Sequence, residues 1–293
     1  MTDFAFPGLN LAVATPFDDD GGIAYDVLEA NLERFIAAGV DGVVLSSGTG
    51  MHVYLSRAES DELVHRGTKI VDGRAKVVVQ TSALLLDDVL DRTRHAAACG
   101  ADGVMVLPPF FEGPSDDDGV FDFYAAVGEG GLPIIGYNVP GAVGVAITPQ
   151  LLVRLAGIPN FAAVKDSSND FAGMTDLIRT GVPVMNGMDC LVPYAAYAGV
   201  AGTIWGGANF APIECVAVME AIKREAWGEV RELWRSLAPV MNLICQDDFV
   251  QAVYAAAEMT GFPVGSPRRP LRALAPDKRE PLRAALGELI SHG

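Results

Sequence analysis

The amino-acid sequence predicts an α/β protein, namely a (β/α)8 TIM barrel followed by a C-terminal helical extension. The first observation is that short, β-branched apolar segments alternate with longer segments of helical periodicity, and such alternation requires parallel strands. The second is a recurring pattern in which a helix end, a glycine, two residues and another glycine precede an apolar strand. A doubly wound open sheet is the alternative fold, but no GxGxxG motif follows the first strand.

The predicted strands are nearly continuous apolar runs, as expected of strands that are buried on both faces. Gly39, Gly100 and Gly199 precede three of them, and each follows a predicted helix end, where a left-handed backbone favours glycine. The predicted strands, in chain order, are 9–15, 41–47, 75–81, 102–108, 132–138, 161–166, 182–187 and 201–207.

The segments between these strands have the pattern of amphipathic helices. Clear examples are 24–39 and 56–73. The second segment opens with Ser56 and has Glu59 three residues later, which is a capping-box pattern. These signals support a helix after each strand.

The strand–helix alternation stops after about residue 211, and further amphipathic helices follow, one of them near 277–290. We therefore divide the chain into a barrel domain over 1–225 and a helical extension over 226–293. We expect the extension to serve packing or assembly.

Composition excludes several classes of function. The 293 residues, 50% of them hydrophobic and 20% charged, suffice for one large core. A formal net charge of -16 without any basic patch argues against nucleic acid or an anionic membrane surface as a partner. No signal peptide or membrane span is recognised, which predicts a cytoplasmic protein. The cysteines lack metal-like spacing and are expected to be reduced; they are Cys99, Cys190, Cys215 and Cys245.

Two predicted strands end in candidate binding or catalytic residues, and chemistry in such barrels takes place at the carboxyl ends of strands. The second strand leads into SSGTGMH (46–52), where glycines around Thr49 expose backbone N–H groups to a carboxylate or phosphate. The fifth ends in GYNVP (136–140), whose Tyr137 can donate or accept a proton. Taken alone, each is better explained as an ordinary glycine-rich turn or a half-buried loop tyrosine.

The sixth predicted strand ends in Lys165, within NFAAVKDSSND (160–170). Burial in an apolar barrel disfavours the ammonium form, and a neutral amine attacks ketones to form a Schiff base. The alternative is an ion pair with Asp166, which would suit a surface loop better than a strand end. Together, the amine, the phenol and the glycine-rich turn are the groups needed to activate a 2-oxo acid.

These motifs resemble the dihydrodipicolinate synthase and N-acetylneuraminate lyase family of barrel aldolases, lyases and dehydratases, which act through a lysine Schiff base. TPF, GTG, YNVP and KDSS follow the first, second, fifth and sixth strands in family order. The separation of Tyr137 and Lys165 also matches the family pattern. NGMD (186–189) and GGANF (206–210) are similar to later loops, so the resemblance covers nearly the whole chain.

The resemblance implies a role for each matching residue. Lys165 would form the Schiff base, and Tyr137 would shuttle the proton. Other residues would hold the carboxylate of pyruvate or a similar 2-oxo acid, or line the floor of the site. It further implies no metal or organic cofactor, and a homotetramer built as a dimer of dimers. The substrate-binding residues that it places in this chain are Gly48, Thr49, Gly50 and Ile204.

The chain also departs from the family pattern. Gly48 replaces a hydroxyl residue and Met51 replaces a glutamate in the usual G-[Ser/Thr]-Thr-Gly-Glu. Dihydrodipicolinate synthases have a tyrosine at the position of Phe111 and an arginine, which grips a distal carboxylate, at the position of Ala142. Without these groups, the lysine-pathway condensation is not expected.

An apolar pocket for an aromatic or weakly charged substrate tail is therefore predicted, with His52 as a polar contact. Assays of aldehydes with and without a distal acid group test this expectation. The side chains expected to form its walls are Met51, Tyr54, Phe110, Phe111, Met188 and Trp205.

Three functions follow from these observations. The first is an aldolase or lyase that makes or breaks a C–C bond between enzyme-bound pyruvate and an aldehyde. The second is a 2-oxo sugar acid dehydratase, since GTG and LPP are similar to the 5-dehydro-4-deoxyglucarate dehydratase branch. The third is a protein that binds 2-oxo acids without turnover, against which the retained lysine and tyrosine argue.

Overall fold

The computed structural model describes residues 5–114, 116–246 and 248–292 and contains a closed barrel of parallel strands in the order β1 to β8. All eight predicted strands are confirmed, and most end before the predicted range does because the motif residues lie in the following loops. The strands are β1 Gly8–Ala12, β2 Gly42–Leu45, β3 Lys76–Gln80, β4 Gly103–Val106, β5 Ile134–Asn138, β6 Phe161–Asp166, β7 Val184–Asn186 and β8 Gly202–Trp205.

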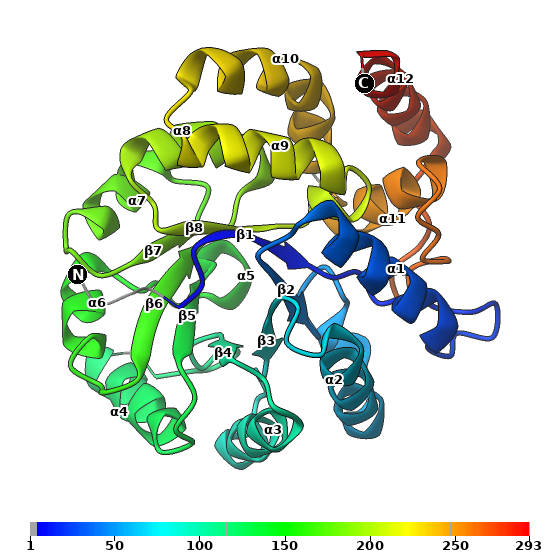
Figure 1. Cartoon of the computed structure of the whole chain (residues 1–293). Helices are drawn as coiled ribbons and strands as arrows, with labels where there is room; N and C mark the ends of the chain where they lie inside the picture. Colours follow the sequence, from blue (N-terminus) through cyan, green and yellow to red (C-terminus); the bar gives the residue numbers. More distant parts are fainter. Residues whose placement is uncertain (1–4, 115, 247, 293) are drawn as a thin grey trace.

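Helices surround the barrel; α10 lies outside it next to α9, and α12 packs on α10 and α11 (Figure 1). The helices that follow successive strands are α1 Tyr25–Ala38, α2 Arg57–Val71, α3 Leu86–Cys99, α4 Asp117–Gly128, α5 Pro140–Val143, α6 Pro149–Leu155, α7 Phe171–Ile178, α8 Val192–Ala198 and α9 Pro212–Lys223. The remaining elements are α10 Trp227–Ile244, α11 Phe249–Met259, α12 Pro276–His292 and the 3-10 turns η1 His52–Tyr54, η2 Asp189–Leu191 and η3 Gly207–Asn209.

Local sequence signals determine several of these boundaries. The capping box of α2 is confirmed: the Ser56 hydroxyl accepts from the Glu59 N–H, and the Glu59 carboxylate accepts from the Ser56 N–H at 2.8 Å. Gly39, Gly100 and Gly199 follow α1, α3 and α8 with φ of 92°, 86° and 101°. Each helix therefore ends where glycine permits a left-handed backbone.

The barrel interior is a packed apolar core, separate from the larger core between the strands and the helices. Tyr137 packs against the interior core from the end of β5. Among the described residues, a cavity lies above this filling, at the carboxyl ends of the strands. The interior residues are Phe6, Ala12, Val44, Val78, Met105, Ile135, Ala163, Met185 and Ile204.

The helical extension packs against the barrel through α10, which lies on α9, through α11, which contacts η3, and through the chain between α11 and α12. In that chain, Arg268 pairs with Glu59 of α2 at 2.7 Å and donates to the Tyr54 carbonyl at 2.9 Å. The hydrogen bonds from Arg268 lower the pKa of Glu59 to about 2. The domain boundary at 225/226 stays a prediction, although α10 does begin at Trp227.

The structure also bears on membrane association. Among the described residues, no helix combines the length and the apolar character that crossing a bilayer requires.

Candidate active site

A cavity of about 330 Å³ opens at the carboxyl ends of the strands. Its walls come from the ends of β1, β5, β6 and β8, from the loops after β2 and β7, and from the helical extension. The lining residues are Ala12, Ser47, Gly48, Thr49, Tyr137, Val139, Lys165, Ser167, Gly187, Met188, Asp189, Ile204, Gly206, Cys245, Phe249 and Val250.

Lys165 extends into this cavity from β6 and is only 6% exposed. The register of β5 and β6 pairs it with Tyr137, and its amine lies 4.1 Å from the centroid of the Tyr137 ring. Successive strand residues face opposite sides, so Asp166 lies on the other face of β6. The amine and the phenol ring are therefore neighbours at the cavity.

The alternative ion pair between Lys165 and Asp166 does not form in the described part of the chain. The Asp166 carboxylate instead accepts hydrogen bonds from the Asn138 amide at 2.6 Å and from the Ser168 hydroxyl at 2.9 Å. Burial raises the pKa of Asp166, and these hydrogen bonds oppose that shift. Asp166 thus holds the β5 and β6 ends together and leaves the lysine amine facing the cavity.

Gly187, directly after β7, makes room for the lysine side chain. A Cβ atom at this position would lie 2.5 Å from Lys165 Cε and 2.1 Å from Ser167 Oγ. No L-residue with a side chain fits there without displacing the amine. In the sequence, this position belongs only to a family-like NGMD string, and the steric reason becomes visible only when β6 and β7 are side by side.

The turn after β2 presents hydrogen-bond donors to the cavity. Within the described part of the chain, the N–H groups of Gly48 and Thr49 and the Thr49 hydroxyl donate to no protein acceptor. The turn is fixed from behind, because the Thr15 hydroxyl donates to the Gly50 carbonyl at 2.7 Å. Tyr254 of α11 in turn donates to the Thr15 carbonyl at 2.6 Å. The arrangement suits a bound carboxylate.

Asp189 is a cavity residue that the sequence reasoning missed. It is 2% exposed, and its carboxylate accepts from the N–H groups of Gly206 and Gly207, the latter at 2.6 Å. Burial raises the pKa of Asp189 to about 6, although these two N–H groups and the charge of Lys165 act to lower it. The only sequence signal was an acidic residue in a loop that follows a strand.

Replacing Asp189 by asparagine is expected to change how stability depends on pH. Its carboxyl binds a proton more tightly in the folded protein than in the unfolded chain, where the pKa is the ordinary 3.8. This group's contribution to the free energy of unfolding therefore falls as pH rises from about 4 to about 6. Urea titrations measure the free energy of unfolding of each protein. The free energy of wild type minus that of Asp189→Asn should fall by about 2 kcal/mol across this pH window.

The exposed Asp176 of α7 provides the matched control for this measurement. Asp176→Asn removes the same charge from an exposed position, so subtracting its effect isolates the contribution that burial makes at Asp189. A wild-type minus Asp189→Asn difference that rises with pH would show that the buried carboxyl has a depressed pKa instead.

The helical extension contributes directly to the cavity, which corrects the expectation that it serves only packing or assembly. Cys245, Phe249 and Val250 line the cavity from α11 and the residues just before it. A Cβ atom on Gly206 would lie 2.7 Å from Phe249 Cζ, so this glycine lets the ring pack over the end of β8. Sequence periodicity assigned these residues to helices but could not show which strand they face.

Some residues that the sequence assigned to the site lie elsewhere. Phe111 is 77% exposed in the loop after β4 and does not line the cavity. His52 is beside Gln80, 3.1 Å between Nε2 atoms, and burial lowers its pKa to about 4. Gly50 is buried behind the turn against Val13. A direct role of these three residues in substrate binding stays a prediction.

The expected apolar wall is also largely incorrect. Trp205 is fully buried, and its indole N–H lies 3.4 Å from the Met241 sulfur; Met51 is buried in the outer core. Of the six side chains proposed for the wall, only Met188 lines the cavity. The strand residue Trp205 points outwards because side chains alternate along β8, and Ile204 takes the inward position and lines the cavity.

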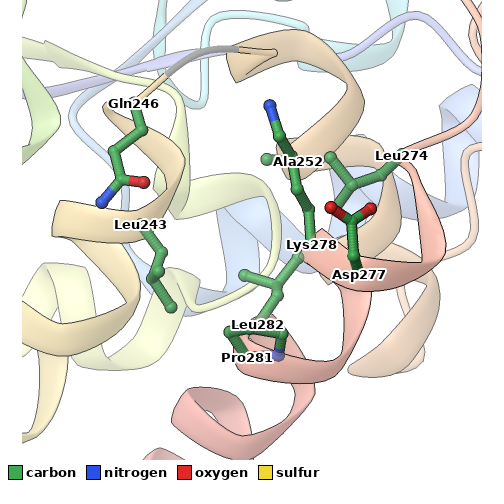
Figure 2. A pocket seen from close by; sticks show the side chains of 8 residues that line it. All are labelled: Leu243, Gln246, Ala252, Leu274, Asp277, Lys278, Pro281 and Leu282. Carbon is green, nitrogen blue, oxygen red and sulfur yellow. The ribbon is translucent and has the colours of Figure 1, made fainter.

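A second cavity, of about 220 Å³, lies outside the barrel between α10, α11 and α12 (Figure 2). Leucine side chains form much of its wall, and the amine of Lys278 pairs with Asp248 at 2.6 Å. It lacks the amine–phenol pair and the free N–H groups found at the barrel end. Within the described residues, no cluster of three or more His, Cys, Asp or Glu side chains could hold a metal ion.

A buried amine over a phenol ring, next to a turn with free N–H donors at the carboxyl end of a (β/α)8 barrel, defines a protein of the class I aldolase type. Comparison with known proteins agrees with this class. The model of the Dihydrodipicolinate synthetase family matches residues 5–289, and the chain belongs to that family, whose members are pyruvate-using lyases and aldolases.

Individual relatives are similar over nearly their whole length. The 4-hydroxy-tetrahydrodipicolinate synthase of Methanoculleus marisnigri is 30% identical over 294 residues, covering 98% of this chain and 100% of that protein. The enzyme of the same name from Exiguobacterium sibiricum is 33% identical over 270 residues, covering 91% of this chain and 92% of that protein. The crystal structure of dihydrodipicolinate synthase from Acinetobacter baumannii complexed with pyruvate superposes with a TM-score of 0.91 at 29% identity, covering 97% and 99% of the two chains.

Proposed function

We propose that this protein is a Schiff-base aldolase or lyase that makes or breaks a C–C bond between pyruvate and an aldehyde without a distal acid group. The observation that carries the proposal is the position of the Lys165 amine, 4.1 Å from the centre of the Tyr137 ring and in a cavity shared with the Gly48–Thr49 turn. The Acinetobacter baumannii relative was crystallised with pyruvate, which supports pyruvate as the 2-oxo acid of this protein as well.

The proposed reaction starts when the neutral Lys165 amine attacks the carbonyl carbon of pyruvate or of a 4-hydroxy-2-oxo acid. Loss of water leaves an iminium ion, and the substrate carboxylate accepts hydrogen bonds from Gly48 and Thr49. In the cleavage direction, Tyr137 removes the hydroxyl proton, the C–C bond breaks, and its electron pair moves into the iminium. The aldehyde leaves, the enamine is protonated, and water releases pyruvate from the lysine.

The buried Asp189 carboxylate is suited to this chemistry. The charges of Asp189 and Lys165 interact, and that interaction favours the ionised carboxylate. By the same electrostatics, a negative charge at Asp189 stabilises the positive iminium that replaces the ammonium. The Gly206 and Gly207 N–H groups hold the carboxylate in place throughout the reaction.

The residues that line the cavity support the proposal that the aldehyde has no distal acid group. No arginine lines it within the described part of the chain, and the position of the synthases' arginine is occupied by Ala142. Apolar groups from Val139, Met188, Phe249 and Val250 form the remaining wall. A carboxylate tail would be buried there without a partner, whereas a neutral tail would not lose hydration to the same extent.

A comparison of aldehydes tests this proposal. With pyruvate as the donor, kcat/KM for benzaldehyde should exceed that for succinic semialdehyde by roughly tenfold or more. Product masses show aldol addition, and the reverse reaction should release pyruvate and the aldehyde. Loss of water from a sugar acid without release of pyruvate would instead identify the dehydratase.

The variant Ala142→Arg gives this comparison a matched control. A guanidinium placed where the synthases have one should raise kcat/KM for succinic semialdehyde relative to benzaldehyde. If the wild-type protein already prefers the acidic aldehyde, the proposed specificity is wrong, although the Schiff-base chemistry can still hold.

A further inference from the structure

Two cysteines that are distant in sequence meet at the wall of the cavity. Cys190 belongs to η2, directly after Asp189, and Cys245 is the C-cap residue that follows α10. The Cys190 N–H donates to the Cys245 sulfur at 3.2 Å, and both residues are free thiols with intermediate exposure. Cys245 also lines the cavity, so this contact connects a cavity wall to the loop that carries the buried carboxylate.

The separation of this pair permits a covalent bond. Because an N–Cα bond is about 1.46 Å long, the Cys190 Cα lies at most about 4.7 Å from the Cys245 sulfur. The two thiols are also side-chain hydrogen-bond partners, so their sulfurs lie near each other and small rotations of the side chains can bring them to disulfide geometry. Neither of the other cysteines is available for this contact: Cys215 is buried in the core, and Cys99 contacts His95 on α3.

The two thiols also differ in reactivity. A hydrogen bond from Cys245 lowers the pKa of Cys190, while the same contact, together with burial, raises the pKa of Cys245. Nucleophilic attack by cysteine requires the thiolate. The lowered pKa favours Cys190 as the attacking thiol, and the contact with Cys245 places the second sulfur in position to resolve the mixed disulfide.

We propose that Cys190 and Cys245 form a reversible disulfide with a low-molecular-weight disulfide as the oxidant, and that this bond switches the cavity to a less active state. The proposal goes beyond the proposed function, and the bond itself can be detected without any assay of catalysis.

The exchange is balanced in atoms and electrons. The Cys190 thiolate attacks one sulfur of oxidised glutathione, forms a mixed disulfide and expels one glutathione thiolate. The Cys245 thiolate then attacks the Cys190 sulfur, closes the protein disulfide and expels the second glutathione. Two cysteine thiols are oxidised, the glutathione disulfide is reduced to two thiols, and the two cysteine protons pass to these leaving groups.

The bond would change the geometry next to the lysine. Bringing the sulfurs to about 2.05 Å draws η2 towards the end of α10. Asp189, one residue before Cys190, accepts from Gly206 and Gly207, so movement of η2 alters these hydrogen bonds. Displacements of about 1 Å at a reacting centre can cost up to about a hundredfold in rate.

The test compares the full-length protein after incubation with reduced or oxidised glutathione. Oxidation should remove two hydrogen atoms from the intact mass and yield one linked pair of peptides, containing Cys190 and Cys245. The initial rate at which cyanoborohydride, which reduces the iminium but leaves disulfides intact, traps pyruvate on Lys165 should fall by roughly tenfold in the oxidised protein. Dithiothreitol should restore both the mass and the rate.

Two sets of variants complete the experiment. Cys190→Ser and Cys245→Ser should each abolish the linked peptides and the difference in trapping rate between the two glutathione treatments. Cys99→Ser should respond as the wild-type protein does. Failure to find the Cys190–Cys245 link in wild type, or its formation without any change in trapping rate, overturns the proposal. Absence of pyruvate trapping even in the reduced protein contradicts the proposed function instead, while the peptide map still decides whether the bond forms.

Discussion

Replacing Lys165 by alanine is expected to lower kcat/KM for aldol addition or cleavage by roughly ten-thousandfold or more. The Lys165 amine is the group that would bond covalently to the 2-oxo carbon, and no second lysine lines the cavity within the described residues. Without this amine no iminium forms, and the unactivated carbonyl is a much poorer acceptor for the electron pair of the breaking C–C bond. Steady-state assays of purified protein measure this change.

Lys76→Ala is the matched control for this variant. Lys76 lies at the start of β3, exposed and paired with Asp102 at 2.7 Å, at the opposite end of a barrel strand from the cavity. Its loss removes a surface ion pair that contributes less than about 1 kcal/mol, so activity should be unchanged. A Lys165→Ala protein that folds normally and retains more than a tenth of wild-type activity would exclude Lys165 as the nucleophile.

Tyr137→Phe should lower kcat by roughly 10²- to 10⁴-fold, the range typical of a lost proton-transfer group. The phenyl ring preserves the packing on the interior core and the face beneath the amine, so pyruvate should still be trapped on Lys165. The expected pattern is thus a large loss of kcat, a small change of KM for pyruvate and normal adduct formation.

Tyr197→Phe provides the corresponding control, because Tyr197 is exposed on α8 and packs against Trp227. That variant should match wild type in kcat and KM. If Tyr137→Phe instead raises KM for pyruvate with kcat intact, the phenol binds the substrate and another group transfers the proton.

The sequence predicted the barrel well because its signals are local. Each strand is a short apolar run, and a glycine with left-handed φ, such as Gly39 or Gly199, ends the helix before it. Parallel strands in a closed barrel then bring their carboxyl ends together. Lys165 and Tyr137 could be assigned to one site for this reason, and the β5–β6 register confirms that they are neighbours.

The rest of the site depends on contacts between segments that are far apart in the chain. In the sequence, Asp189 is an ordinary loop carboxylate. Only the structure shows that the N–H groups of Gly206 and Gly207 donate to it. In the sequence, Phe249 is one residue of an amphipathic helix. Only the structure shows that its ring packs over Gly206. Trp205 was misplaced because hydrophobicity alone does not tell which side of a doubly buried strand a residue faces.

Borohydride reduction in the presence of pyruvate, followed by peptide mass analysis, tests the central claim most directly. The account predicts one pyruvate adduct, on the peptide that contains Lys165, and its disappearance in Lys165→Ala. The absence of an adduct at saturating pyruvate, or an adduct confined to another lysine, would contradict it.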